Sequence, residues 1–146
     1  MPKTELRVKP SVAEIKKLYA RKKKHLLNTE PAMKKVAIYL DSWVHRNFKT
    51  EGALVGGWKP LQAGGRWGSR GFDTSAKILR DTGVMEHSFV PFTAKDNAGI
   101  GTDLGYAKKH EKGEGVPKRK ILPRKKDVMK RVREILKNHI TLTRSK

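Results

Sequence analysis

The chain has 146 residues, a formal net charge of +20 at pH 7 and no cysteine. The length predicts one domain with a single core, and the missing cysteines exclude a disulfide framework, a thiolate zinc site and a cysteine nucleophile. The charge predicts attraction to polyanions or to an acidic protein partner. No apolar run suits a signal peptide or approaches the roughly 18 residues of a membrane-spanning helix, so we expect a soluble protein without membrane contact.

The positive charge lies toward the two ends of the chain. Residues 76–107 hold three Lys or Arg against four Asp or Glu, so the middle is close to neutral. We therefore predict a basic N-terminal helical extension over residues 1–28 and a folded domain over residues 29–146.

The N-terminal extension should contain one short basic helix. Ser11 and Glu14 have the spacing of a capping box, in which each side chain satisfies a backbone donor beside the other. Ile15 and Leu18 then recur at helical spacing, which predicts a helix over Val12–Lys24. Its apolar stripe is thin, so we expect this helix to be mobile or to dock late.

The next helix has the widest apolar face. Thr29 can cap it, Pro31 suits its first turn, and the pattern ends near Lys49. Such a stripe is typical of a core helix rather than of a ligand site. The residues on this face are Met33, Val36, Ala37, Leu40, Trp43, Val44 and Phe48.

A glycine-rich stretch over residues 64–71 combines glycine with Arg66, Trp67 and Arg70. Proteins that bind single-stranded nucleic acid use arginine and aromatic residues for backbone contact and base stacking. A flexible surface loop has the same composition, and we favour that interpretation because the stretch is short and does not repeat.

The middle of the chain predicts a short helix followed by a hairpin. Ser75–Asp81 should be helical and end at Gly83. Met85–Phe92 predicts a strand, which Pro91 confines to the edge of a sheet. Gly99–Thr102 then predicts the returning strand of a hairpin.

The last third predicts two helices joined by an extended segment. Tyr106–Lys112 should form a single turn closed by Gly113, and Lys120–Leu122 should be extended. A helix begins after Pro123 and reaches Ile140, with an apolar face that should cover a sheet. The fold class is therefore α+β, a small antiparallel sheet packed against two long helices.

Catalytic and metal-binding patterns are weak. The five histidines are scattered without the i, i+4 pairing of a metal-binding helix. His110 and Glu111 form the best candidate pair, but a surface pair is the simpler interpretation. The glycines of Gly99–Gly105 depart from a dinucleotide-binding loop. We expect no enzyme activity, no metal and no cofactor.

Several short segments together resemble a known family. They are Phe48-Lys49-Thr50-Glu51-Gly52, Gly57-Trp58-Lys59-Pro60-Leu61, Ile78-Leu79-Arg80-Asp81-Thr82-Gly83, Ser88-Phe89, Gly101-Thr102, Tyr106-Ala107, His110-Glu111-Lys112-Gly113 and Pro117-Lys118-Arg119. Their order resembles the phage virion morphogenesis family, which includes Mu-like virion morphogenesis proteins and phage tail completion proteins. The resemblance runs from about Met33 to His139 and leaves out the basic N-terminal helix. Lys118 departs from it, because a small residue is usual there.

The resemblance implies a structural assembly protein of a tailed phage or prophage, acting in tail completion or head-tail joining as a ring of subunits. Its implied partners are further copies of itself and other tail or head-tail connector proteins, in the virion and, during assembly, in the host cytoplasm. The alternative is a basic nucleic-acid-binding protein of the ribosome-associated kind, which the charge favours and the lack of a recognisable binding module disfavours.

Basic residues are the candidates for contact with a partner or, without sequence preference, with DNA. They lie in the first helix, the glycine-rich loop, the extended segment and the last helix. They are Lys22, Lys23, Lys24, Arg66, Arg70, Arg119, Lys126, Lys130 and Arg133.

Overall fold

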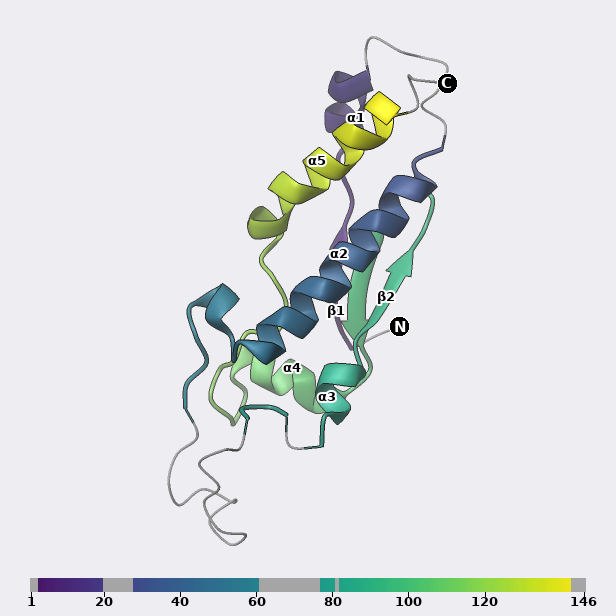
Figure 1. The fold of residues 1–146 in the computed structure, drawn as a ribbon. Coiled ribbons are helices and arrows are strands. Elements are labelled where there is room, and N and C mark those ends of the chain that lie inside the picture. Colours follow the sequence, from purple (N-terminus) through teal and green to yellow (C-terminus); the bar gives the residue numbers. More distant parts are fainter. Residues whose placement is uncertain (1–2, 20–27, 61–76, 81, 143–146) are drawn as a thin grey trace, which may run out of the picture.

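The computed structural model describes residues 3–19, 28–60, 77–80 and 82–142. It confirms an α+β fold with a three-stranded antiparallel sheet in the order β1-β3-β2. The strands are β1 (Thr4–Val8), β2 (Val90–Thr93) and β3 (Ala98–Thr102). Helix α2 (Glu30–Lys49) packs on β2 and β3, and α5 (Lys125–Leu142) packs on α2, so the helices lie side by side (Figure 1).

Strand β1 is the strand that the sequence did not predict. Thr4 and Val8 are buried and Glu5 and Arg7 are exposed, so the five residues do alternate as a half-buried strand should. An alternation over only five residues, inside a basic stretch, does not predict a strand unless the strand that it pairs with is known. Residues 4–8, assigned to the N-terminal extension, are thus part of the sheet, whereas the boundary between residues 28 and 29 stays a prediction.

The predicted hairpin is present, with a shorter first strand. β2 begins at Val90, because Val84–His87 forms the short helix α3 in place of the first part of the expected strand. The Ala94 amide donates to the Asn97 carbonyl at 2.8 Å and closes the turn. β2 is at the edge of the sheet, as Pro91 indicates, because proline has no amide N–H to donate to a second neighbouring strand.

The short helix expected over Ser75–Asp81 is wrong in the part that the structure describes. Residues 77–80 form a turn, and Leu79 has a φ of +60° that a helix does not allow. Residues 75, 76 and 81 lie outside the described residues. Gly83 has the left-handed φ that was expected, +74°, but it precedes α3 instead of ending a helix.

Helix α2 has the predicted bounds and a different cap. Thr29 precedes it, but the Thr29 hydroxyl donates to the Lys95 carbonyl in the hairpin turn. The side-chain oxygen of Asn28 instead accepts from the Glu30 amide at 3.2 Å. Thr29 therefore ties the start of α2 to the sheet. The predicted apolar face is buried: Met33, Val36, Ala37, Leu40, Trp43, Val44 and Phe48.

Helix α1 (Val12–Tyr19) begins with the predicted capping box. The Glu14 amide donates to the Ser11 hydroxyl at 3.1 Å, and the Ser11 amide donates to the Glu14 carboxylate at 3.1 Å. The predicted continuation to Lys24 lies outside the described residues, and the mobility of this helix stays a prediction.

The C-terminal helices are confirmed with two corrections. α4 spans Gly105–Lys112, longer than the predicted single turn, and Gly113 ends it with a φ of +81°. The apolar face of α5, with Val128, Val132 and Leu136 fully buried, packs mainly on α2 and not on the sheet as expected. The reason is that α2 already covers β2 and β3.

The centre of the sheet is tightly closed around Gly99. A Cβ at this position would lie 2.3 Å from the Phe92 ring and 2.4 Å from the Leu6 carbonyl oxygen. The Arg7 guanidinium sits 5.3 Å from the centre of the same ring, on the face of the sheet that carries Glu5 and Arg7. Only glycine leaves room for this stacking.

We predict that Gly99→Ala lowers the free energy of unfolding by about 1–3 kcal/mol, because the neighbouring backbone cannot move away from the added methyl group. Gly105→Ala is the matched control: nothing lies within 4 Å of its added Cβ. Since Gly105 is the exposed first residue of α4, that change should alter the free energy of unfolding by less than about 0.5 kcal/mol. Urea unfolding measures both, and equal midpoints would contradict the packing around Gly99.

Candidate functional site

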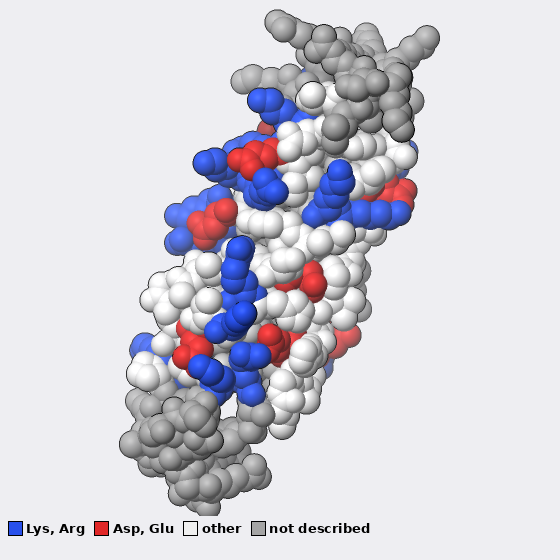
Figure 2. Space-filling view, in the orientation of Figure 1, with Lys and Arg blue, Asp and Glu red and all other residues white. Residues whose placement is uncertain are grey.

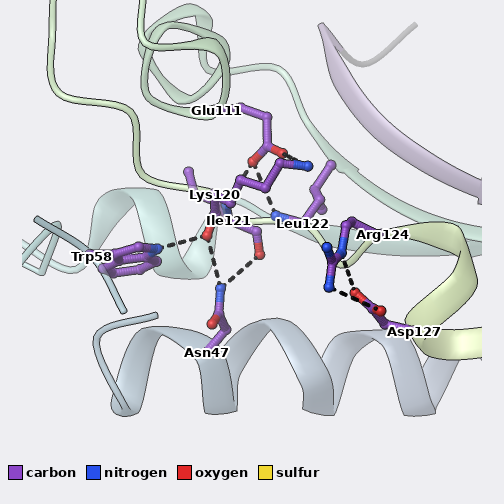
Figure 3. A network of polar contacts seen from close by, with 8 residues as sticks. All are labelled: Asn47, Trp58, Glu111, Lys120, Ile121, Leu122, Arg124 and Asp127. Carbon is purple, nitrogen blue, oxygen red and sulfur yellow. Dashed lines mark hydrogen bonds and ion pairs between the residues drawn. The ribbon is translucent and has the colours of Figure 1, made fainter. Parts of the chain in front are cut away.

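The extended segment 119–122 runs through the interior between α2, the residues after α2 and α4 (Figure 3). Ile121 is fully buried and Leu122 nearly so. Buried backbone amides and carbonyls must find partners, since no ladder of a sheet supplies them here. Three side chains supply them, those of Asn47, Trp58 and Glu111. A fourth, Arg119, bonds the neighbouring Lys59 carbonyl, and we call these four residues the polar cluster.

Glu111 of α4 binds the amides of the segment. Its Oε2 accepts from the Ile121 amide at 2.6 Å and from the Leu122 amide at 3.1 Å. Lys120 lies 3.9 Å from the other carboxylate oxygen. The interpretation of His110 and Glu111 as a surface pair is therefore wrong, because both are partly buried and Glu111 is committed to backbone amides.

Asn47 and Trp58 bind the carbonyls. The Asn47 amide nitrogen donates to the Lys120 and Ile121 carbonyls, both at 3.1 Å, and the Trp58 indole donates to the Lys120 carbonyl at 2.7 Å. Asn47 is fully buried in α2. Sequence reasoning missed it; the available signal was an asparagine among the core positions of a helix.

Trp58 also explains why a glycine follows α2. Its ring lies edge-on to Phe48, with ring centres 5.4 Å apart, and it covers Gly52 so closely that an added Cβ would be 2.3 Å from the indole. Glu51 next to it accepts from the Ile78 amide at 3.0 Å. Three of the short segments that carry the family resemblance thus meet in space, those that contain Phe48, Trp58 and Ile78.

Arg119 is inside the fold. Its side chain is 6% exposed, and Nε and Nη2 both donate to the Lys59 carbonyl at 3.1 Å. Its amide donates to the His110 carbonyl at 2.8 Å. Burial lowers the pKa of Arg119. These contacts join α4 to the residues after α2, and a contact between Arg119 and DNA or a partner stays a prediction.

Three other candidate residues gather on the exposed side of α5. Lys126, Lys130 and Arg133 are exposed and follow one another at helical spacing. Arg133 donates to Glu14 of α1 at 3.0 Å. Figure 2 shows Lys and Arg side chains along α5. The remaining candidates, Lys22, Lys23, Lys24, Arg66 and Arg70, lie outside the described residues.

The polar cluster joins α2, the residues after α2, α4 and segment 119–122. Together with the sheet, these elements form a small α+β domain. In the part of the chain that the structure describes, no three His, Asp or Glu side chains come together as metal ligands. No described helix is both long and apolar enough to cross a membrane.

The chain matches the phage virion morphogenesis family over residues 11–141, and it belongs to that family. The match begins before α1, so the expectation that the first basic helix lies outside the family region is wrong. No curated protein and no solved structure matches the chain significantly.

We predict that Glu111→Ala destabilises the fold by about 2–3 kcal/mol, because two buried amides lose a charged acceptor. Glu114→Ala is the control, since its carboxylate makes an exposed ion pair with Lys112 at 3.7 Å. It should cost less than about 0.5 kcal/mol. Chemical unfolding monitored by tryptophan fluorescence compares them, and similar losses would refute the role of Glu111.

A second prediction concerns pH and His110. Burial, and then the positive charge of Arg119, lower the pKa of His110 below its ordinary value near 6.5. The unfolded chain then binds the proton more readily than the folded one, so stability is full above about pH 6.5 and falls as the pH drops through the lowered pKa.

His110→Gln should therefore flatten the dependence of unfolding free energy on pH between about 6.5 and 5, a window above the ordinary pKa values of carboxylates. Unfolding curves at several pH values measure this dependence. The same slope in wild type and His110→Gln would show that His110 does not carry it.

Proposed function

We propose that the protein is a structural assembly component of a tailed phage or prophage that acts in tail completion or head-tail joining as a ring of subunits. The single observation that carries this proposal is the family match over residues 11–141. The family-like segments with Trp58, Glu111 and Arg119 meet at the polar cluster, which supports a role based on shape and contacts, without catalysis.

The ring is supported by the two unlike edges of the sheet. Among the strands that the structure describes, β2 pairs with β3 alone; it carries no charged residue and leaves Val90 63% exposed. Pro91 removes one amide donor from this edge, but the carbonyls remain available. The other edge, β1, carries Glu5 and Arg7. Contacts between unlike surfaces are those that close a ring, and an uncharged edge strand is a ready pairing surface.

The partners proposed for the ring are further copies of this chain and other tail or head-tail connector proteins. We place the protein in the virion and, during assembly, in the host cytoplasm. The ribosome-associated alternative takes second place, because the matched family is one of virion morphogenesis. The family match does not say what the net charge of +20 binds.

We predict that light scattering of the purified protein, alone and mixed with phage tail tubes, shows a ring-sized oligomer or capped tubes. Val90→Lys should abolish this assembly, because a charge on an edge strand opposes pairing. Val12→Lys is the matched control, since Val12 of α1 is 61% exposed against 63% for Val90. It should assemble like the wild type.

Both changes are at exposed positions, so unfolding midpoints should change little. A wild-type protein that stays monomeric at all concentrations and ignores tails would refute the ring. Assembly of Val90→Lys at wild-type level would instead reject β2 as the contact surface.

A further inference from the structure

The exposed side of α5 carries a basic stripe formed by Lys126, Lys130, Arg133 and Lys137. With about 100° per residue, the four positions fall within roughly 60° of the helix circumference. With a rise of about 1.5 Å per residue, they extend over roughly 16 Å. The stripe is opposite the face that packs on α2, and all four residues are exposed. Helix α1 approaches the stripe at Arg133.

The acids of α5 do not neutralise this stripe. Asp127 is paired with Arg124 at 2.7 Å, and Glu134 is paired with Arg131 at 3.0 Å. Arg131 lies further round the helix, away from the stripe, and Arg124 precedes the helix. The hydrogen bond from Arg124, and more weakly the charges of Arg124 and Lys126, hold the pKa of Asp127 below its usual value. Asp127 is therefore ionised, and its hydrogen bonds go to Arg124 and not to a lysine of the stripe.

The positive charges of the stripe lysines are not neutralised by ion pairs within the described residues. Arg133 is paired with Glu14 of α1. Within the described residues, Lys126, Lys130 and Lys137 form no ion pair with any acid. The acids near the stripe are therefore paired with arginines, and Lys126, Lys130 and Lys137 remain available to bind an external anion.

The chemistry of the stripe favours a polyphosphate over a protein. Protein interfaces are enriched in aromatic residues and arginine and depleted in lysine, and the stripe has three lysines and no aromatic residue. Lysine is a flexible point charge that meets phosphates without a fixed geometry. Roughly 16 Å along the duplex axis corresponds to about five phosphates of each strand.

We propose that the basic stripe of α5 binds the phosphate backbone of double-stranded DNA without sequence preference. The inference rests on the proposed function in one respect: the DNA would be that of the virion in which the protein assembles. Binding itself is independent of ring formation, so the two proposals fail in distinguishable ways.

The test measures binding of the full chain to a duplex of random sequence between about 50 and 200 mM salt. Each phosphate contact contributes roughly 0.9 to the slope of log affinity against log salt. The triple variant Lys126→Gln, Lys130→Gln, Lys137→Gln should therefore show a slope shallower by about 2.7 and affinity weaker by roughly tenfold or more.

The matched control is Lys35→Gln, Lys49→Gln, Lys108→Gln, which removes the same charge from exposed lysines of α2 and α4. It should keep a slope close to wild type. Circular dichroism and light scattering confirm that both variants fold and assemble as the wild type does.

Equal losses in the two triple variants would overturn the proposal, because diffuse charge would then explain binding. A wild type that does not bind the duplex would overturn it as well. Poly-glutamate serves as a protein-like polyanion: if the stripe variant loses affinity for poly-glutamate and keeps it for the duplex, the partner is an acidic protein and the inference is wrong.

Discussion

The hydrogen bonds to the backbone of residues 120–122 are the constraint on which the rest of the structure depends. This segment crosses the core without a neighbouring strand, so each buried amide and carbonyl has to be satisfied by a side chain. Glu111 of α4 accepts from the amides of this segment, and Asn47 of α2 donates to its carbonyls. Trp58, in the residues after α2, donates to the Lys120 carbonyl. Because α5 begins directly after this segment, the same bonds fix where α5 starts and how it meets α2.

Hydrophobic periodicity and turn residues were sufficient to predict those helices and strands that show a clear pattern in their own sequence. The apolar faces of α2 and α5 repeat over many turns, and the β2-β3 hairpin has a proline and a turn to mark it. β1 has only five residues and becomes a strand through pairing with β3, which no local pattern reveals. The turn at residues 77–80 depends on Glu51, 27 positions earlier.

The polar cluster was predictable in its order along the chain and not in its geometry. The segments that contain Trp58, Glu111 and Arg119 were singled out together, but their charges and rings indicated a surface as readily as a core. The structure shows that Arg119 belongs to the core, where its guanidinium donates two hydrogen bonds to the Lys59 carbonyl. The basic side of α5, in contrast, could be predicted from spacing alone, because exposed residues need no tertiary partner to be placed on a helix.

The pairing of β1 with β3 has a consequence for the order of folding. Thr4 is opposite Thr102, so about a hundred residues of chain separate the two strands of this ladder. During synthesis β1 leaves the ribosome long before its partner, and it has no neighbour to pair with until the hairpin exists. Closing so long a loop is slow, which makes β1 a late step in folding. Until then β3 has a free edge, and a crowded assembly site would favour those chains that close it quickly.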